Sequence, residues 1–174
     1  MTVSELSEVW RTFFLFGIVM STHLLKSQRT PYVRNEEIQQ NWILVDAENQ
    51  TLGRLASLIA YRIQGKHRVD QSFHQTVGDF VVVINAGKIS VTGNKMDQKI
   101  YYHHSRYPGG LRETTLADKM DRDPAFALET AVKRMLPKGP RGRKMALQLK
   151  IYAGAEHPHQ AQKPTPVVLN ENKQ

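Results

Sequence analysis

A run of five consecutive β-forming residues, FVVVI at residues 80–84, constrains the fold of this 174-residue chain most strongly. An unbroken apolar run of this length is typical of a central strand that is buried on both faces. A shorter run, WILV at residues 42–45, has the same character. Between the two runs, apolar residues recur at helical spacing from Leu52 to Ile63, and Gly65 is placed to end that helix. Strand, striped helix and strand form the βαβ pattern, which predicts a parallel sheet covered by helices.

The second half of the chain adds further elements to this unit. Residues 88–92 alternate in polarity as a strand does, and residues 123–124 (Asp-Pro) supply the cap and first-turn proline that begin a helix. Pro137 ends that helix. A short second helix is predicted over residues 142–149, and a last strand or extended segment follows over residues 150–154. We therefore predict an α/β fold around a small, mostly parallel sheet.

These elements predict a single α/β domain over residues 41–155. Residues 1–40 are interpreted as an N-terminal extension and arm, and residues 156–174 as a C-terminal tail. The chain shows no helical or strand period over residues 21–40 or beyond Glu156, and extended tails are expected there.

Residues 13–20 form the only stretch that hints at targeting, because they are eight apolar residues in a row. A membrane-spanning helix needs about 20 such residues. No positive cluster precedes the run and its surroundings are not rich in Arg, so it fits neither a signal peptide nor an organellar transit peptide. We favour the interpretation that Met20 is the true translation start and that residues 1–19 are a mis-called extension.

The most uneven distribution of charge lies at residues 131–150, which carry seven Lys or Arg and no Asp or Glu in a chain of net charge +8. Each Lys or Arg that meets a phosphate releases condensed counterions, so this density of one sign favours a polyanion as partner. Two prolines and two glycines within residues 137–142 place the charges at a rigid break between two helices. A solvated basic helix face is the alternative, but the lack of any acidic residue favours nucleic acid.

A second set of cations is interleaved with aromatic residues, which indicates RNA in particular. Residues 99–107 combine three Tyr, two His and two cations. Aromatic rings stack on unpaired bases and attract cations through their faces. Losing one of these cations should weaken binding without changing the preferred sequence, because phosphate contacts position a protein and do not read bases. The predicted RNA-binding residues are Lys66, His67, Arg68, Lys95, Lys99, His103, His104, Arg106, Lys133, Lys138, Arg141, Arg143 and Lys144.

Patterns for catalysis or cofactor binding are weak. Neither G-x-x-x-x-G-K-[ST] nor G-x-G-x-x-G occurs, and without Cys the chain has no disulfide, thiolate metal site or cysteine nucleophile. His103 and His104 are adjacent, so on a strand they would point to opposite faces and chelate one metal ion poorly. Asp79 is interpreted as a turn cap or the partner of a basic neighbour rather than as a catalytic acid. We expect no enzyme activity, no cofactor, no metal and no small-molecule substrate.

A dozen short motifs keep the order and spacing of a known family. The chain resembles the large-subunit ribosomal proteins of the L-thirteen family, bacterial type, over about residues 30–168. The motifs are W-x-x-x-D-A at 42–47, LGRLA at 52–56, GKH at 65–67, GD at 78–79, NA at 85–86, TGNK at 92–95, HS at 104–105, PGG at 108–110, AVK at 131–133, MLPKG at 135–139, GR at 142–143 and YAG-x-EHPH at 152–159.

The resemblance implies a three-layer α/β/α fold, contact with large-subunit ribosomal RNA and with neighbouring large-subunit proteins, and a role early in subunit assembly. It implies no catalysis. Four residues depart from the usual family pattern: Phe73 stands where Pro is common, Thr76 where Asp is common, Arg134 where Gly is usual and Arg141 where Leu is common. The first two leave the local conformation of residues 70–78 open, and Arg134 would be costly to bury in a protein core.

We therefore expect a structural constituent of the large ribosomal subunit that binds ribosomal RNA through basic loops and tails. An α/β enzyme acting on RNA or a nucleotide, and an RNA-binding translational regulator acting off the ribosome, are the alternatives. The expected location is the bacterial cytoplasm, on the ribosome, in preference to an organelle, with no membrane partner.

Overall fold

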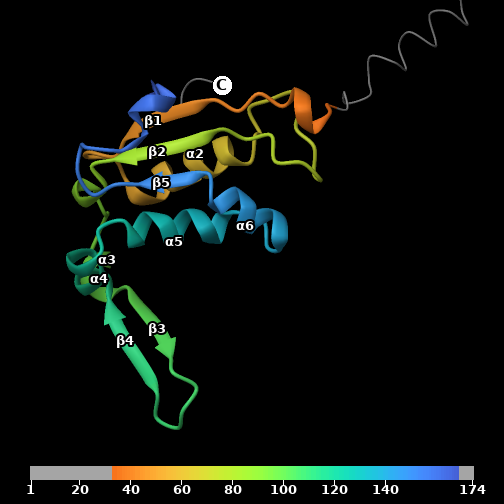
Figure 1. The fold of residues 1–174 in the computed structure, drawn as a ribbon. Helices are drawn as coiled ribbons and strands as arrows, with labels where there is room; N and C mark the ends of the chain where they lie inside the picture. Colours follow the sequence, from red (N-terminus) through yellow and green to blue (C-terminus); the bar gives the residue numbers. More distant parts are fainter. Residues whose placement is uncertain (1–32, 169–174) are drawn as a thin grey trace, which may run out of the picture. The chain divides into compact units, whose positions relative to one another are not determined.

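The computed structural model describes residues 33–168 (Figure 1). The interpretations of residues 1–32, including the translation start and most of the N-terminal arm, lie outside the described residues. Arg34–Gln174 form one compact unit, and its described part begins with the short 3-10 helix η1 (Asn35–Glu37).

Four parallel strands form the main sheet, in the order β5-β2-β1-β6. The two runs that most resembled buried strands are the central pair, and they align from Trp42 opposite Phe80 to Asp46 opposite Ile84. The α/β class and the small, mostly parallel sheet are thus confirmed. The strands are β1 (Trp42–Asp46), β2 (Phe80–Ile84), β5 (Leu149–Ile151) and β6 (Thr165–Pro166).

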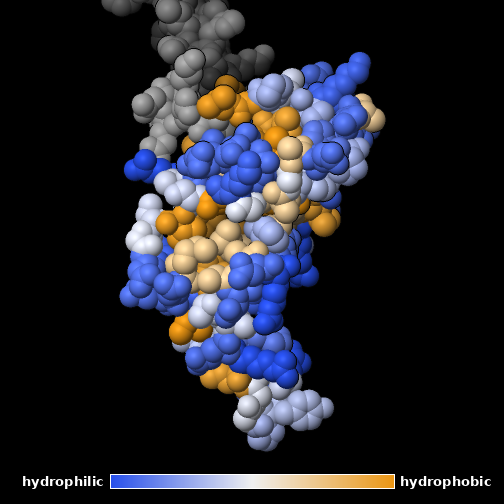
Figure 2. Space-filling view, turned by 90° about the vertical axis from the view of Figure 1, so that its left-hand side faces the viewer, coloured by the Kyte–Doolittle hydropathy of each residue, from blue (hydrophilic) through white to orange (hydrophobic). Residues whose placement is uncertain are grey.

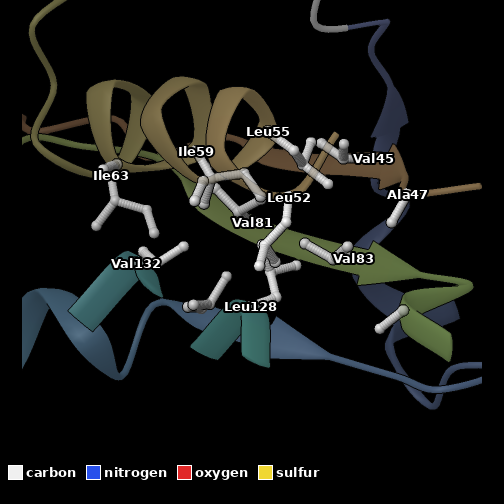
Figure 3. Close-up of a cluster of buried hydrophobic side chains, with 14 of the residues drawn as sticks. Val45, Ala47, Leu52, Leu55, Ile59, Ile63, Val81, Val83, Leu128 and Val132 are labelled. Atoms are coloured by element: carbon white, nitrogen blue, oxygen red, sulfur yellow. The ribbon is translucent and has the colours of Figure 1, made fainter. Parts of the chain in front are cut away.

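Two helices cover one face of this sheet. The striped helix α2 (Leu52–Ile63) and helix α5 (Phe126–Met135) bury their apolar stripes against alternate residues of β1 and β2 (Figure 3). Val45 of β1 and Val81 and Val83 of β2 are fully buried in this cluster. Both helices lie on the same face because the chain moves from β1 to β2 to β5 in one direction, and right-handed crossovers then stay on one side.

The opposite face is covered by the return from β5 to β6. This step reverses direction across the sheet, so a right-handed connection passes over the other side. The 3-10 helix η3 (His159–Gln162) lies there, and the ring centroid of His159 is 5.2 Å from that of Trp42. Trp42 also stacks on Phe80 at 4.6 Å. The second outer layer is therefore one short 3-10 helix and extended chain, and strand β6 follows within a segment that showed no periodicity.

An antiparallel hairpin separates from the sheet between β2 and α5. It consists of β3 (Ile100–His104) and β4 (Leu111–Thr115), and it is flanked by the short helices α3 (Lys95–Gln98) and α4 (Leu116–Arg122). Figure 1 shows the hairpin extending away from the sheet and its two covering helices. The strand predicted over residues 88–92 is wrong, because η2 (Ala86–Lys88) occupies its start and only a single bridge joins Ser90 to Thr51.

The basic stretch folds as predicted into two helices separated by a break. Helix α5 ends at Met135 and helix α6 (Pro140–Ala146) begins after the Pro-Lys-Gly segment. Within residues 33–168, no helix is both long and apolar enough to cross a membrane.

Candidate nucleic-acid interface

The hairpin carries one group of predicted RNA-binding residues on its exposed surface. Lys95 and Lys99 precede β3. His103 and His104 are the last two residues of β3, and Arg106 lies in the loop at the tip of the hairpin. All five are exposed. Neither strand has a clearly apolar face, because most side chains on both faces of the hairpin are exposed to water. In Figure 2 the lower end of the described chain, which is the hairpin, is mostly hydrophilic.

The tip of the hairpin is held by local contacts. The backbone N–H of Arg106 donates to Nδ1 of His104 at 2.9 Å, and the N–H of Ser105 donates to the carbonyl of Gly110 at 3.0 Å. A Cβ on Gly110 would lie 2.0 Å from Oγ of Ser105 and 2.9 Å from the carbonyl oxygen of Tyr107, so a larger residue there would require the tip to shift. Arg106 itself has φ of 68°, a left-handed conformation that non-glycine residues rarely adopt. Beside it Tyr107 is 75% exposed, so the tip presents a cation next to an aromatic ring.

The break between α5 and α6 depends on a close backbone contact. A Cβ on Gly142 would lie 1.7 Å from the carbonyl oxygen of Pro137, so the second helix can approach the end of the first only with glycine at this position. Gly139 precedes α6 with φ of 114°, which also favours glycine. These two glycines explain why the charges of residues 131–150 lie around a bend and not along one helix face.

A cleft of about 760 Å³ follows this bend. One acidic residue, Glu129, faces it, and its Oε1 pairs with Nζ of Lys133 at 2.6 Å. The remaining charged residues of its lining are all cations, so the cleft is electropositive. They are Lys133, Arg134, Lys138, Arg143 and Lys150.

Arg134, which would be costly to bury, is exposed. Its position on the last turn of α5 therefore carries no desolvation penalty of the kind expected for a core residue.

Three predicted site residues are engaged inside the protein. Nε2 of His67 lies 3.0 Å from Oδ2 of Asp79, a carboxylate that is 2% exposed. Burial lowers the pKa of His67, and the cations Arg62 and Arg68 lower it further, while Asp79 opposes them. At neutral pH the imidazole is therefore uncharged, and its contact with Asp79 is a hydrogen bond from Nε2–H to the carboxylate. Asp79 was interpreted as a turn cap or the partner of a basic neighbour, and its contact with His67 bears out the second of these.

Arg68 and Arg141 are the other two. Arg68 forms a two-point pair with Asp70, at 3.0 and 2.9 Å, and also donates to the carbonyl of Gln39. The guanidinium of Arg141 donates to the carbonyls of Ser72, at 3.0 Å, and Phe73. In these contacts the guanidinium N–H groups donate to other parts of the protein. The same N–H groups are then not available to donate to a phosphate, so both side chains have a structural role in the free protein.

The remaining predicted residues lie at the hairpin, in the cleft, in the loop after α2 and, for Lys144, on the exposed surface of α6. Lys133 is exposed but forms an ion pair with Glu129. The exposed residues for which the described chain shows no ion pair are Lys66, Lys95, Lys99, His103, His104, Arg106, Lys138, Arg143 and Lys144.

The sequence prediction missed two cations that the structure brings to these groups. Arg112 stands directly opposite His103 in the β3–β4 register and is exposed. The Pro-Gly-Gly turn at residues 108–110 was recognised, and folding the chain back at that turn would have identified the pair. Lys150 lies in the basic stretch and lines the cleft.

No group of three or more His, Asp or Glu side chains that could hold a metal ion occurs among residues 33–168. The exposed Lys, Arg and Tyr side chains of the hairpin and the cleft define a basic α/β protein whose surface suits a polyanion.

Comparison with known proteins identifies the family to which this basic α/β protein belongs. The family model of ribosomal protein L13 matches residues 40–158. The chain is 53% identical over 136 residues to large ribosomal subunit protein uL13 of Vibrio campbellii, covering 78% of this chain and 96% of the relative. It is 54% identical over 140 residues to uL13 of Thermosipho africanus, with 80% and 94% covered, and 49% identical over 142 residues to uL13 of Thermotoga petrophila, with 82% and 95% covered. The chain belongs to the ribosomal protein L13 family.

Proposed function

We propose that this protein is a structural constituent of the large ribosomal subunit and that it binds large-subunit ribosomal RNA. Its membership of the ribosomal protein L13 family supports this function, and the relatives named above are large-subunit proteins from bacteria. The proposed location is therefore the bacterial cytoplasm, on the ribosome, with ribosomal RNA and neighbouring large-subunit proteins as partners.

The observation that carries the RNA-binding part is the distribution of charge around the α5–α6 bend. The cleft there is lined by five cations and a single carboxylate, which is already paired with Lys133. A cleft lined by one sign of charge concentrates counter-charged ligands, and a phosphate backbone supplies many such charges in a row.

The hairpin is proposed as a second contact. Tyr102 and Tyr107 are 64% and 75% exposed, and the exposed cations Lys99, Arg106 and Arg112 lie on the same hairpin or next to it. Rings and cations side by side suit unpaired RNA, where bases stack and phosphates are neutralised together. Contacts to phosphate and stacking on rings position a protein without reading base edges, so we expect little sequence preference from this binding.

Participation in early subunit assembly is proposed on the same basis. A protein that binds through phosphates and unpaired bases needs no preformed protein neighbour to attach to naked RNA. The internal framework of this chain, with a buried sheet and a hairpin held by backbone bonds, does not depend on such a neighbour.

The test is binding of the full-length protein to naked large-subunit ribosomal RNA at several salt concentrations. If four of the exposed cations meet phosphates, log K should fall with log salt at a slope of roughly −3 to −4. Co-sedimentation of the native protein with large subunits from lysate provides the second measurement. Binding that is equally strong at 50 and 500 mM salt, or a protein found free of subunits, would rule out the proposal.

A further inference from the structure

The connection between α2 and β2, residues 64–79, is longer than most connections between elements, and side chains brace it from several sides. Within it Arg68 pairs with Asp70, and Oγ of Ser72 donates to Oε1 of Gln75 at 3.0 Å. From outside, Nε2 of Gln40 donates to the carbonyl of Thr76 at 3.0 Å. These contacts restrict the conformations that the long connection can adopt.

Arg141 supplies a brace from a distant part of the chain. From the first turn of α6 its guanidinium reaches the carbonyls of two successive loop residues, Ser72 and Phe73. Burial lowers the pKa of Arg141, yet a guanidinium stays charged at any physiological pH. Two backbone carbonyls thus accept hydrogen bonds from a partly buried charge, and these bonds fix the backbone of the loop at Ser72 and at the next residue.

That residue is Phe73, whose side chain is 92% exposed. A charged side chain therefore fixes the backbone of an aromatic residue whose own side chain is not part of the core. A single exposed apolar residue is common on protein surfaces, but one whose backbone carbonyl is fixed by a partly buried arginine is prearranged for a contact.

The surroundings of the loop are cationic. Lys144 lies three residues after Arg141 on α6 and is exposed, and Lys66 is exposed at the start of the loop. Asp70 is neutralised by Arg68. A cleft of about 470 Å³ between the loop and α6 has Thr76 and Lys144 in its lining.

We propose that Phe73 is a stacking platform for an unpaired RNA base, with Lys144 on the adjoining phosphate and Arg141 as the positioning residue of the loop. This inference rests on the proposed RNA-binding function and adds a specific contact to it. An RNA base is favoured over a pocket on a neighbouring protein because a cation, Lys144, lines the cleft beside the loop, whereas protein interfaces are depleted of charge at their core.

The experiment uses the full-length protein and purified, naked large-subunit ribosomal RNA, with Kd measured across a salt series. Phe73→Ala should weaken binding about 5- to 150-fold, the range that one stacked base contributes. The slope of log K against log salt should not change, because no charge is removed. Phe73→Trp should bind as well as the natural protein, and Phe73→Leu, which keeps apolar bulk without a ring, should bind as weakly as Phe73→Ala.

Val69→Ala is the matched control, because Val69 lies in the same connection and is 87% exposed but has no ring. It should leave Kd unchanged. Lys144→Ala should instead reduce the salt slope by about 0.7–0.9. If the natural protein shows the expected slope but all three Phe73 variants bind RNA equally well, the proposed function stands and the stacking platform is overturned. Loss of Phe73→Ala protein from assembled subunits, with RNA binding intact, would likewise overturn it in favour of a protein pocket.

The role of Arg141 is tested through Phe73. Arg141→Met keeps an unbranched apolar stem and removes both carbonyl contacts, so the loop loses its brace. The variant should weaken RNA binding several-fold in the natural background and have little effect in the Phe73→Ala background. Equal weakening in both backgrounds, with a reduced salt slope, would show that Arg141 contacts phosphate directly and would overturn its positioning role.

Discussion

The guanidinium carbon of Arg134 lies 6.0 Å from the ring centroid of Tyr101, so the last turn of α5 is joined to the start of the hairpin strand β3. Nζ of Lys99 lies 5.4 Å from the same centroid. Tyr101 also meets Phe126, at the first turn of α5, edge to face at 5.2 Å. The half-buried Tyr101 therefore contacts one aromatic ring and two cations. Two of these partners lie at opposite ends of α5, so the contacts link the base of the hairpin to both ends of that helix.

Replacing this tyrosine should loosen the base of the hairpin. Tyr101→Leu keeps the apolar volume but removes the ring that Arg134, Lys99 and Phe126 contact. The loss should be about 1–2 kcal/mol of unfolding free energy, from one aromatic pair and exposed cation–π contacts. Urea unfolding measures it. Tyr102→Leu is the control, since Tyr102 is the next residue in the strand and is 64% exposed, and its replacement should change stability by no more than about 0.5 kcal/mol. Equal losses for both variants would contradict the tie.

The central βαβ unit was predictable because its signals are local. The run at residues 80–84 and the stripe from Leu52 to Ile63 each indicate their own element, and right-handed crossover places them. Strand β6 was not predictable in this way. Thr165 and Pro166 pair with β1 only because the return segment crosses the far face, where His159 meets Trp42. No property of a two-residue strand that contains proline shows this before the chain is folded.

Two glycines that look alike in sequence should respond in opposite ways to alanine. Gly142→Ala should destabilise the protein by roughly 2–3 kcal/mol, the upper end of the range for overpacking, because the added Cβ meets a backbone oxygen that cannot move aside easily. Gly53→Ala is the matched control on helix α2, where nothing lies within 4 Å of the added Cβ. It should stabilise the helix by about 0.5–1 kcal/mol. Thermal or urea unfolding of the two variants distinguishes them, and a destabilised Gly53→Ala would refute this interpretation.

His67 should make the stability depend on pH just below neutrality. Burial lowers its folded-state pKa beneath the unfolded value of about 6.5. Above pH 6.5 both states hold a neutral imidazole, and the contribution is fully present. As the pH falls below 6.5 the unfolded chain takes up the proton first, so stability is lost until the folded-state pKa is reached. The slope from this one group cannot exceed about 1.4 kcal/mol per pH unit.

The measurement is urea unfolding between pH 5.5 and 7.5 for the natural protein and for His67→Gln. Glutamine keeps an N–H donor for Asp79 but does not titrate, so the variant should show a shallower fall in stability on the acid side. His103→Gln, on the exposed hairpin, is the control and should leave the slope as it is. A steeper fall in His67→Gln than in the natural protein would show that the sign is reversed and that the folded protein favours the charged imidazole.

The cations of the candidate interface were found by charge alone, and charge does not distinguish a surface residue from a framework residue. Arg141 and Arg143 stand two residues apart in one basic run. The first turns back to carbonyls that lie 68 and 69 residues earlier in the chain, while the second is exposed at the cleft. That distinction depends on the position of the 64–79 connection, which no periodicity fixes. Arg112 was missed for the same reason, since its partner in register is on another strand.

Exposed and internally engaged cations should therefore differ in how their removal changes the salt dependence of RNA binding. Lys138→Ala and Arg143→Ala remove cations that line the α5–α6 cleft, and each should reduce the slope of log K against log salt by about 0.7–0.9, because one phosphate contact is lost. Arg68→Ala removes the same charge but from a side chain held by Asp70 and the carbonyl of Gln39. It should leave the slope nearly unchanged and lower the unfolding free energy by roughly 1–3 kcal/mol, as for a hydrogen bond to a charged group. Salt-series binding to naked large-subunit RNA, with urea unfolding on the same preparations, measures both quantities. A lower slope for Arg68→Ala at unchanged stability would place Arg68 on the RNA and would show that its contacts within the free protein give way on binding.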